Sequence, residues 1–364
     1  MARTKFNNVK ISGLTTVIAS NCESIDDEEE LYDGDLDKIR RLKKTVGLGE
    51  RYVVDDDTTS LDLCAQALER LVEGMDLDKS NIDGLIFVTQ TPDYFLPSNS
   101  SIIHGKFKLP KSCACIDLNQ GCSGYVYGLW VAHMMISSGT CSKVVLLAGD
   151  SMSRTVNPKD KASLPLFGDS GTATLIELSS NPLNSYFDLN TDGTGFGSII
   201  IPAGGFRKPS TEKTKIEFED GENIRSEENL AMHGGEVFKF ATREVPKAVE
   251  SILNYSGNSA KDLDALVFHQ ANKFVIQNII KRLKNHDLTD VLIPLDTVSK
   301  YGNQGPSSIP STISDSLRHD VSHSIKKMLL CGFGVGLSWA SAVLMMDKIF
   351  CPKIYFYKKE IKND

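Results

Sequence analysis

Residues 114–137 read ACIDLNQGCSGYVYGLWVAHMMIS and contain the feature that decides the fold. A short apolar run, 114–118, is followed by a turn between Gly121 and Gly124 and by a helical stretch from Tyr125 to Ser137. This order predicts a strand, a tight turn and a helix. Cys122 lies in the turn, where the N–H groups and positive end of the helix would favour a thiolate. A thiolate is a strong nucleophile, so the segment indicates covalent catalysis through sulfur.

The composition of the 364-residue chain is that of a globular protein, and it excludes several other classes. A net charge of −7 argues against general nucleic-acid binding. No apolar run approaches the roughly 18–20 residues of a membrane span, and residues 11–20 mix polar residues into apolar ones, as a first β-strand does. The eight cysteines lie mostly in apolar segments without disulfide spacing, which fits a cytoplasmic protein. Cys113 and Cys115 are too close in sequence for the usual zinc pair, so we expect no metal site.

Three apolar segments of the first half recur in the second half at similar spacing. They are residues 83–88, 115–118 and 143–147, and then residues 264–268, 292–296 and 326–330. The spacing of about 30 residues is the length of a strand-helix-strand unit. The stretches between them, 100–107, 125–137, 273–283 and 308–318, are expected to be helices. The repeat predicts an α/β protein of two similar halves, 1–181 and 182–364, with mostly parallel sheets.

Reactive side chains occupy matching places in this layout. Cys122 follows the second predicted strand of the first half, His269 follows the first strand of the second half, and Asn303 follows the next one. Reactive groups of α/β sheets gather beyond the carboxyl ends of strands, so these three side chains are expected to share one pocket. The polar, Gly-rich stretch 192–229 is expected to form a surface excursion near the mouth of that pocket.

Four motifs in this order resemble the thiolase-fold ketosynthases, and most closely β-ketoacyl-acyl carrier protein synthase III. They are GCSGY at 121–125, HQAN at 269–272, GN at 302–303 and GFGVGLSW at 332–339. The resemblance implies a thiolase-like fold in which the two halves pack as α-β-α-β-α layers. It also implies a homodimer and a role in fatty-acid, specialised-lipid or secondary-metabolite biosynthesis.

The resemblance further implies an acyltransferase that performs a decarboxylative Claisen condensation. Cys122 would accept the acyl primer, and His269 and Asn303 would hydrogen-bond the thioester carbonyl of malonyl-acyl carrier protein. The backbone N–H of Cys122 and one from Gly334-Val335-Gly336 would bind the oxyanion. The product would be a 3-oxoacyl thioester. No permanently bound cofactor is implied, because the substrates arrive as thioesters on coenzyme A or on the phosphopantetheine of acyl carrier protein.

Substrate and carrier contacts are also carried over from the resemblance. They are Asn272 for the phosphopantetheine arm, Lys239, Lys281 and Arg282 for the acidic acyl carrier protein, and Phe95 and Leu96 for acyl length in the partner's tunnel. Acidic carriers are attracted by basic residues. The alternatives are solvated helix faces for the basic residues and ordinary interface packing for Phe95 and Leu96.

The sequence departs from the family pattern where the primer donor is held. The Trp and Arg that grip the nucleotide of coenzyme A are absent from residues 40–51. Phe274, Gln304-Gly305 and Ala340 replace an Arg, a Thr-Ser pair and a Gly of the family pattern. These changes leave the primer and its donor open, and they indicate a specialised paralogue.

Other functions remain as alternatives. A paralogue of the same fold could transfer an acyl group from a carrier thioester without decarboxylation, although the presence of both His269 and Asn303 favours decarboxylation. A hydroxymethylglutaryl-type synthase needs a Glu base that has no assignable match. A papain-type hydrolase is disfavoured by the two-half repeat, and a non-catalytic scaffold is disfavoured by the three reactive side chains.

Overall fold

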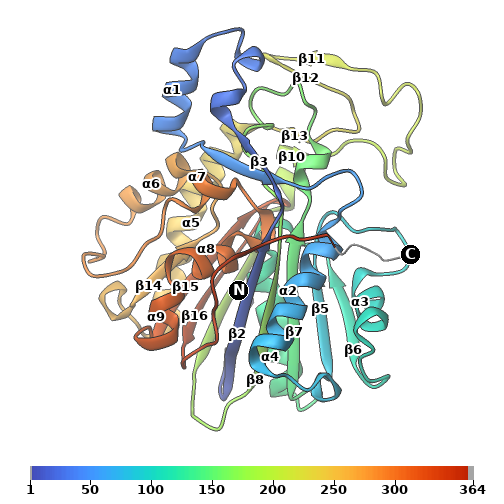
Figure 1. Cartoon of the computed structure of the whole chain (residues 1–364). Coiled ribbons are helices and arrows are strands. Elements are labelled where there is room, and N and C mark those ends of the chain that lie inside the picture. Colours follow the sequence, from blue (N-terminus) through green and yellow to red (C-terminus); the bar gives the residue numbers. More distant parts are fainter. Residues whose placement is uncertain (1, 360–364) are drawn as a thin grey trace.

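Two large β-sheets form the frame of the chain, and the computed structural model describes residues 2–359 (Figure 1). The strands of the first sheet are ordered β17-β2-β8-β7-β5-β6, and those of the second are ordered β1-β9-β16-β15-β14. Their bounds are β1 Ala2–Phe6, β2 Val9–Ile18, β5 Gly84–Val88, β6 Ala114–Leu118, β7 Lys143–Asp150, β8 Ser170–Leu178, β9 Ser185–Thr191, β14 Ala265–Phe268, β15 Lys327–Gly334, β16 Ser338–Met345 and β17 Tyr355–Phe356. The longer helices are α1 Leu36–Thr45, α2 Ser60–Met75, α3 Asn99–Phe107, α4 Gly124–Ser137, α5 Gly234–Ser256, α6 Lys273–Arg282 and α8 Ser308–Ser316.

The strands that lead to the predicted site are joined in parallel. In the first sheet, β5 pairs in parallel with both β6 and β7, and in the second sheet β14 pairs in parallel with β15. The pairs that involve β8, β9 and β16 are antiparallel. Because parallel strands end at the same edge of a sheet, β6 ends at the same edge as β5 and β7, and β14 ends at the same edge as β15.

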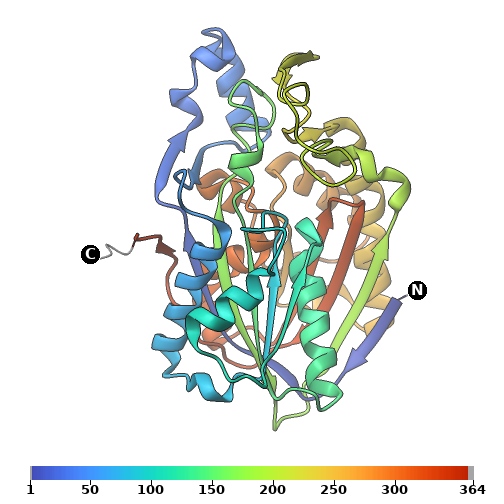
Figure 2. The same cartoon turned by 90° about the vertical axis from the view of Figure 1, so that its right-hand side faces the viewer.

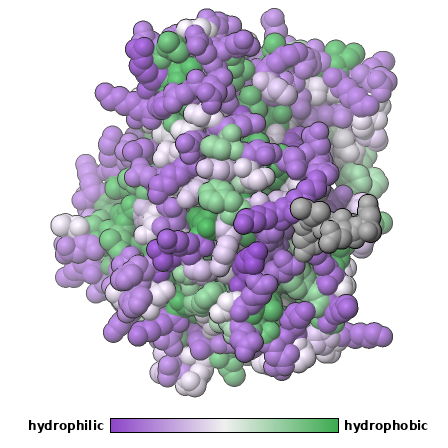
Figure 3. Space-filling view, in the orientation of Figure 1, coloured by the Kyte–Doolittle hydropathy of each residue, from purple (hydrophilic) through white to green (hydrophobic). Residues whose placement is uncertain are grey.

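Helices fill the space between the two sheets and cover their outer faces. Side chains of α4 and α8, such as Leu129 and Ile309, pack in one apolar cluster with residues from both sheets. Helices α2 and α3 cover the outer face of the first sheet, and α5 and α6 cover that of the second. The α/β class with α-β-α-β-α layering is therefore confirmed. Figure 3 shows that the face seen in Figure 1 is mostly hydrophilic, as expected when apolar side chains fill the layers.

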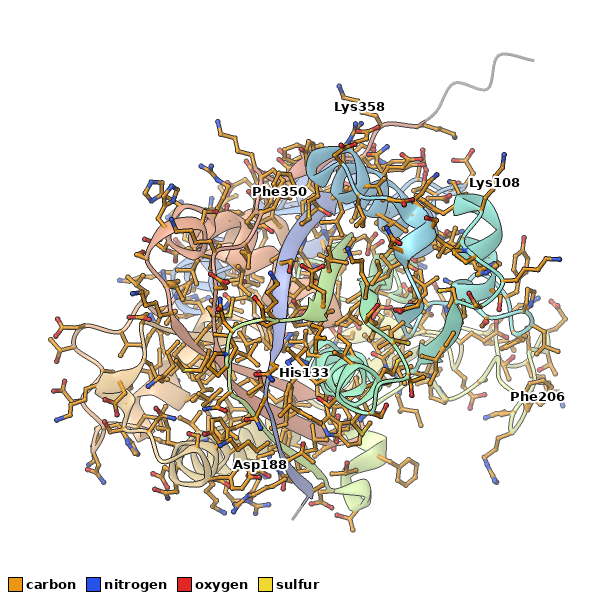
Figure 4. The ribbon with its side chains drawn as sticks, turned by 90° about the horizontal axis from the view of Figure 1, so that it is seen from below. Lys108, His133, Asp188, Phe206, Phe350 and Lys358 are labelled. Carbon is orange, nitrogen blue, oxygen red and sulfur yellow. The ribbon has the colours of Figure 1, made fainter. Side chains whose placement is uncertain are left out.

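The two ends of the chain cross over between the sheets. Strand β1 pairs with β9 in the second sheet, and β17 pairs with β2 in the first. Arg3 anchors β1 through its Nε, which donates to Asp188 on β9 at 3.0 Å, and Figure 4 labels Asp188 on the underside of the molecule. In Figure 2 strands β1 and β17 lie on opposite sides of the molecule. The division into 1–181 and 182–364 remains a prediction. Strand β1 precedes this division but joins the second sheet, and strand β17 follows it but joins the first sheet.

A smaller layer of short elements covers one end of both sheets, at the top of Figure 1. It contains α1 and three two-stranded ribbons, which pair β3 (Asn21–Ser24) with β4 (Glu50–Val53), β10 (Ile199–Ile200) with β13 (Ala231–Met232), and β11 (Phe218–Asp220) with β12 (Asn223–Arg225). Its own apolar cluster includes Leu42, Met152, Ile199 and Met232. The predicted excursion 192–229 belongs to this layer.

One predicted strand is wrong. Residues 292–296 make a single isolated bridge, between Leu292 and Ala265, and do not continue as a strand. Pro294 has no N–H to donate, so a ladder cannot extend through it. Two short helices lie in this part of the chain. Helix α7, Thr297–Tyr301, follows this segment, and helix α9, Arg318–His323, follows α8.

We predict that Gly171→Ala lowers the thermal stability of the protein. A Cβ at this position would lie 2.3 Å from the backbone N of Cys64, so helix α2 would have to move away from β8. Overpacking of this kind typically costs about 1–3 kcal/mol. The matched control is Gly197→Ala, where a Cβ would meet no atom within 4 Å. Thermal unfolding of the two variants side by side is the test, and equal midpoints would contradict the close crossing of α2 over β8.

Candidate active site

Cys122 is held in a tight turn between β6 and α4. The turn is a short 3-10 helix, Gly121–Ser123, which opens with a positive φ of 52° at Gly121. Strand β15 approaches the turn closely, since a Cβ at Gly334 would lie 2.8 Å from the Cys122 sulfur. The hydroxyls of Ser123 and Ser338 join the turn to β16 at 2.7 Å. The predicted nucleophile, which belongs to the first half of the chain, therefore lies in close contact with a strand of the second half.

The expected thiolate at Cys122 is not supported by the structure. Burial raises the pKa of the thiol to about 12, and the negative charge of Asp150 acts in the same direction. Backbone N–H groups of Val335 and Cys122 favour the thiolate but do not offset burial. The side chain is partly accessible and lines the pocket. It is nevertheless too buried for solvent to stabilise a negative charge on its sulfur. Cys122 is therefore a neutral thiol before substrate binds.

His269 follows β14 and is fixed through its backbone and its ring. Its N–H donates to the carbonyl of Cys331 at 2.9 Å, and its Nδ1 lies 2.6 Å from the hydroxyl oxygen of Ser308. That hydroxyl accepts the N–H of Gln270 at 3.3 Å, so its own proton is available to Nδ1. This assignment leaves the imidazole proton on Nε2. Burial lowers the pKa of His269 to about 3, although the backbone of Gly305 partly opposes the shift, so the ring is neutral.

Asn303 is held by backbone bonds to the first half of the chain. Its N–H donates to Leu166 at 2.7 Å, and its carbonyl accepts from Gly168 at 3.1 Å. Its side-chain Oδ1 accepts the N–H of Gly305 at 3.1 Å. Because Oδ1 is engaged in this way, the Nδ2 group is the part of the carboxamide left to donate a hydrogen bond.

These side chains line one pocket of about 730 Å³, counting space that is open to solvent. The predicted site residues that line it are Cys122, His269, Asn303, Asn272, Gly334 and Val335, whereas Gly336 does not. The rest of the wall is largely apolar and includes Ile199 and Met232 from the covering layer. Asn272 also begins α6, since its Oδ1 accepts the N–H of Val275 at 2.8 Å. The pocket therefore combines a few hydrogen-bond donors with apolar walls that exclude water.

The other predicted contact residues lie outside this pocket. Lys239, Lys281 and Arg282 are exposed, and the ammonium of Lys239 lies 3.1 Å from Glu236 on the same helix. Phe95 and Leu96 are 75% and 87% exposed. Phe95 packs against Phe206, with ring centroids 5.6 Å apart, and Figure 4 labels Phe206 at the edge of the molecule. Within a single chain, neither Phe95 nor Leu96 contacts the pocket that contains Cys122.

Sequence reasoning missed three polar residues at the site. Ser308 orients His269, Gln90 lines the pocket, and Asp150 is buried behind it. Oδ1 of Asp150 accepts hydrogen bonds from Thr89 at 2.8 Å and from the N–H of Gln90 at 2.7 Å. Burial raises the pKa of Asp150 to about 6. Asp150 could have been identified from its position at the end of an apolar strand. Ser308 and Gln90 lie in no motif that would have identified them.

Neither a metal site nor a membrane-spanning helix appears in residues 2–359. No group of three or more His, Cys, Asp or Glu side chains in this range could hold a metal ion. No helix in the same range is long and apolar enough to cross a bilayer.

Comparison with known proteins gives one consistent family. Models of 3-oxoacyl-[acyl-carrier-protein] synthase III match residues 116–195, and those of its C-terminal part match residues 253–346. A Campylobacter jejuni protein provisionally named 3-oxoacyl-[acyl-carrier-protein] synthase 3 is 37% identical, with 98% of this chain and 99% of that protein covered. A Caldanaerobacter subterraneus β-ketoacyl-[acyl-carrier-protein] synthase III is 33% identical, over 88% of this chain and 95% of its own.

Solved structures agree with these sequence matches. The crystal structure of a 3-oxoacyl-(acyl-carrier protein) synthase from Burkholderia xenovorans superposes with a TM-score of 0.89. It is 33% identical and covers 98% of this chain and 99% of its own.

We predict that the alkylation rate of Cys122 by iodoacetamide rises about tenfold per pH unit from pH 7 to pH 9.5. The raised pKa of about 12 means that the reactive thiolate fraction is still growing throughout this range. Peptide mass spectrometry separates Cys122 from the exposed Cys22 and Cys115. A plateau below pH 8 would show that the thiolate is stable and that burial does not control this sulfur.

Proposed function

Because the chain belongs to the 3-oxoacyl-[acyl-carrier-protein] synthase III family, we propose that it joins an acyl primer to malonyl-acyl carrier protein by decarboxylative Claisen condensation. The primer is held as a thioester on Cys122, and the product is a 3-oxoacyl thioester on the carrier. The single observation that carries the proposal is the convergence of Cys122, His269 and Asn303 on one largely apolar pocket.

The first half-reaction transfers the acyl group to sulfur. The Cys122 thiol attacks the thioester carbonyl of the primer, and the bond to the donor thiol breaks. The oxyanion that forms is stabilised by the backbone N–H groups of Cys122 and Val335, which already lie close enough to the sulfur to favour its charged form. The thiol proton passes to the departing donor thiol, so the step needs no base with a free imidazole nitrogen. No resident cofactor takes part.

The second half-reaction forms the new carbon–carbon bond. Carbon dioxide leaves the malonyl thioester, and negative charge develops on its carbonyl oxygen as an enolate. Nε2–H of His269 and Nδ2–H of Asn303 donate to that oxygen, and one such donor is typically worth about 3 kcal/mol in a site that excludes water. The enolate carbon attacks the acyl carbonyl, the bond to sulfur breaks, and the Cys122 thiolate that leaves takes a proton from solvent. Neutral donors suit this step, because they stabilise the charge only as it forms.

Carrier binding belongs to the same proposal. Asn272 lines the pocket, and its Nδ2 is available to the phosphopantetheine arm while Oδ1 caps α6. Lys281 and Arg282 are exposed at the end of α6 and would attract an acidic carrier protein in the cytoplasm. Lys239 contributes less to this attraction, because Glu236 neutralises it at 3.1 Å.

We also propose that the protein is a homodimer. The outermost strand of the first sheet, β6, has exposed residues at 114–116, including a 40% exposed Ile116. An open edge strand with apolar side chains offers unpaired backbone groups to a second copy. Tyr94, Phe95 and Leu96 add further exposed apolar surface. In such a dimer Phe95 and Leu96 would serve the partner's acyl tunnel rather than their own pocket.

We predict that Cys122→Ala abolishes acylation of the protein, and that His269→Ala and Asn303→Ala retain it but lose carbon dioxide release. Each of the latter changes removes one donor to the enolate oxygen, and a loss of about 10²–10³-fold is expected. Intact-protein mass spectrometry measures acylation from acyl-coenzyme A and acyl-carrier donors, and labelled malonyl-acyl carrier protein measures decarboxylation. Exposed Lys247→Ala on α5 is the control and should change neither. Undiminished release in both donor variants would contradict the roles assigned to them.

A further inference from the structure

Gln90 separates the pocket that contains Cys122 from a second cavity. It follows β5 by two residues, and its backbone N–H is fixed by Asp150 at 2.7 Å. The residue lines the first pocket together with Cys122. It also lines the second cavity, which measures about 1000 Å³ counting space that is open to solvent. A chain that extends from Cys122 into the second cavity would pass this side chain.

The carboxamide of Gln90 lies directly against the turn that presents the nucleophile. A Cβ at Gly121 would be 2.7 Å from the Oε1 of Gln90 and 3.1 Å from its Nε2. Any larger residue at 121 would therefore collide with the amide, and Gly121 immediately precedes Cys122. The amide is thus placed beside the first carbons of an acyl group on the sulfur.

That amide has no protein partner. Among residues 2–359, no side chain or backbone group makes a hydrogen bond to the Oε1 or Nε2 of Gln90. The side chain is only partly exposed, and the same pocket presents Met152, Leu166 and Phe167. An acyl group that enters the pocket shields the amide from solvent, and a hydrocarbon chain offers the amide no hydrogen bond.

The second cavity has some polar residues in a largely apolar wall. Its wall includes Thr59, Thr91, Ser151 and Arg154. The Arg154 guanidinium is held at 2.9 Å from the carbonyl of Asp56. Thr59 and Thr91 are already paired with Asp62 and Asp150, as Arg154 is with Asp56. The Gln90 amide is a group that a plain alkyl chain would leave unpaired.

We propose that Gln90 is a specificity-determining residue that selects acyl primers carrying a hydroxyl group near the thioester. Its Nε2 donates to the hydroxyl oxygen, or its Oε1 accepts the hydroxyl proton. A site built to hydrogen-bond a substrate group discriminates strongly against the analogue that lacks it, because the amide is then left unpaired. This inference rests on the proposed function, since it concerns the primer that acylates Cys122.

The test compares donors of equal chain length. Acylation rates of Cys122 are measured by intact-protein mass spectrometry with butyryl thioesters and with 2-, 3- and 4-hydroxybutyryl thioesters, on coenzyme A and on carrier phosphopantetheine. The protein should prefer at least one hydroxylated donor by about tenfold or more. Gln90→Met keeps the length of the side chain and removes the amide, so this preference should disappear. Gln277→Met on α6, away from both cavities, is the matched control and should retain the preference.

The outcomes separate this inference from the proposed function. Acylation of Cys122 at rates within about twofold across the panel would overturn the role of Gln90 while leaving condensation intact. A preference that persists in Gln90→Met would overturn it equally. Absence of acylation with every donor would instead overturn the proposed function, and the inference with it.

Discussion

The site depends on a short backbone bridge between the two halves of the chain. Asn303 donates to Leu166 at 2.7 Å and accepts from Gly168 at 3.1 Å, which places a residue of the second half inside the first. The bridge requires very close contact, because a Cβ at Gly168 would lie 2.0 Å from the carbonyl oxygen of Tyr301. The approach of β15 to the Cys122 turn, with glycine at 334, completes the join. Neither half alone contains the pocket, so its geometry follows from how the two halves pack.

Burial is the second constraint, and it determines the kind of chemistry that the pocket can support. It raises the pKa of Cys122 to about 12 and lowers that of His269 to about 3, so both side chains are neutral. An ion pair between them is therefore disfavoured before substrate arrives. Stabilisation must come from dipoles that are already oriented, namely backbone N–H groups, an imidazole N–H and a carboxamide. This arrangement suits a reaction in which negative charge forms on substrate oxygens and then moves on.

Much of the fold and of the candidate site could be predicted from the sequence, because apolar periodicity and the four motifs are properties of short segments. The strands before Cys122 and His269 and the helices after them follow from such patterns, and so does their meeting at the strand ends. Residues 292–296 were apolar enough to suggest a strand, but Pro294 limits them to one bridge. The predicted thiolate at Cys122 is wrong. The sequence shows the adjacent helix end that favours a thiolate, but it does not show the burial that opposes one, because burial depends on the whole fold. Ser308, Gln90 and Asp150 could not be assigned, since their roles come from contacts between distant segments. The exchange of β1 and β17 between the sheets is equally non-local.

A crystal structure of the protein with an acyl group on Cys122 tests the central claim most directly. If the two halves build one site, the acyl carbonyl oxygen will lie about 3 Å from the backbone nitrogens of Cys122 and Val335. The face of the acyl carbon that is open to attack will point toward His269 and Asn303. An acyl oxygen that points away from both nitrogens, or an acyl carbon closed off from the two side chains, would contradict the account.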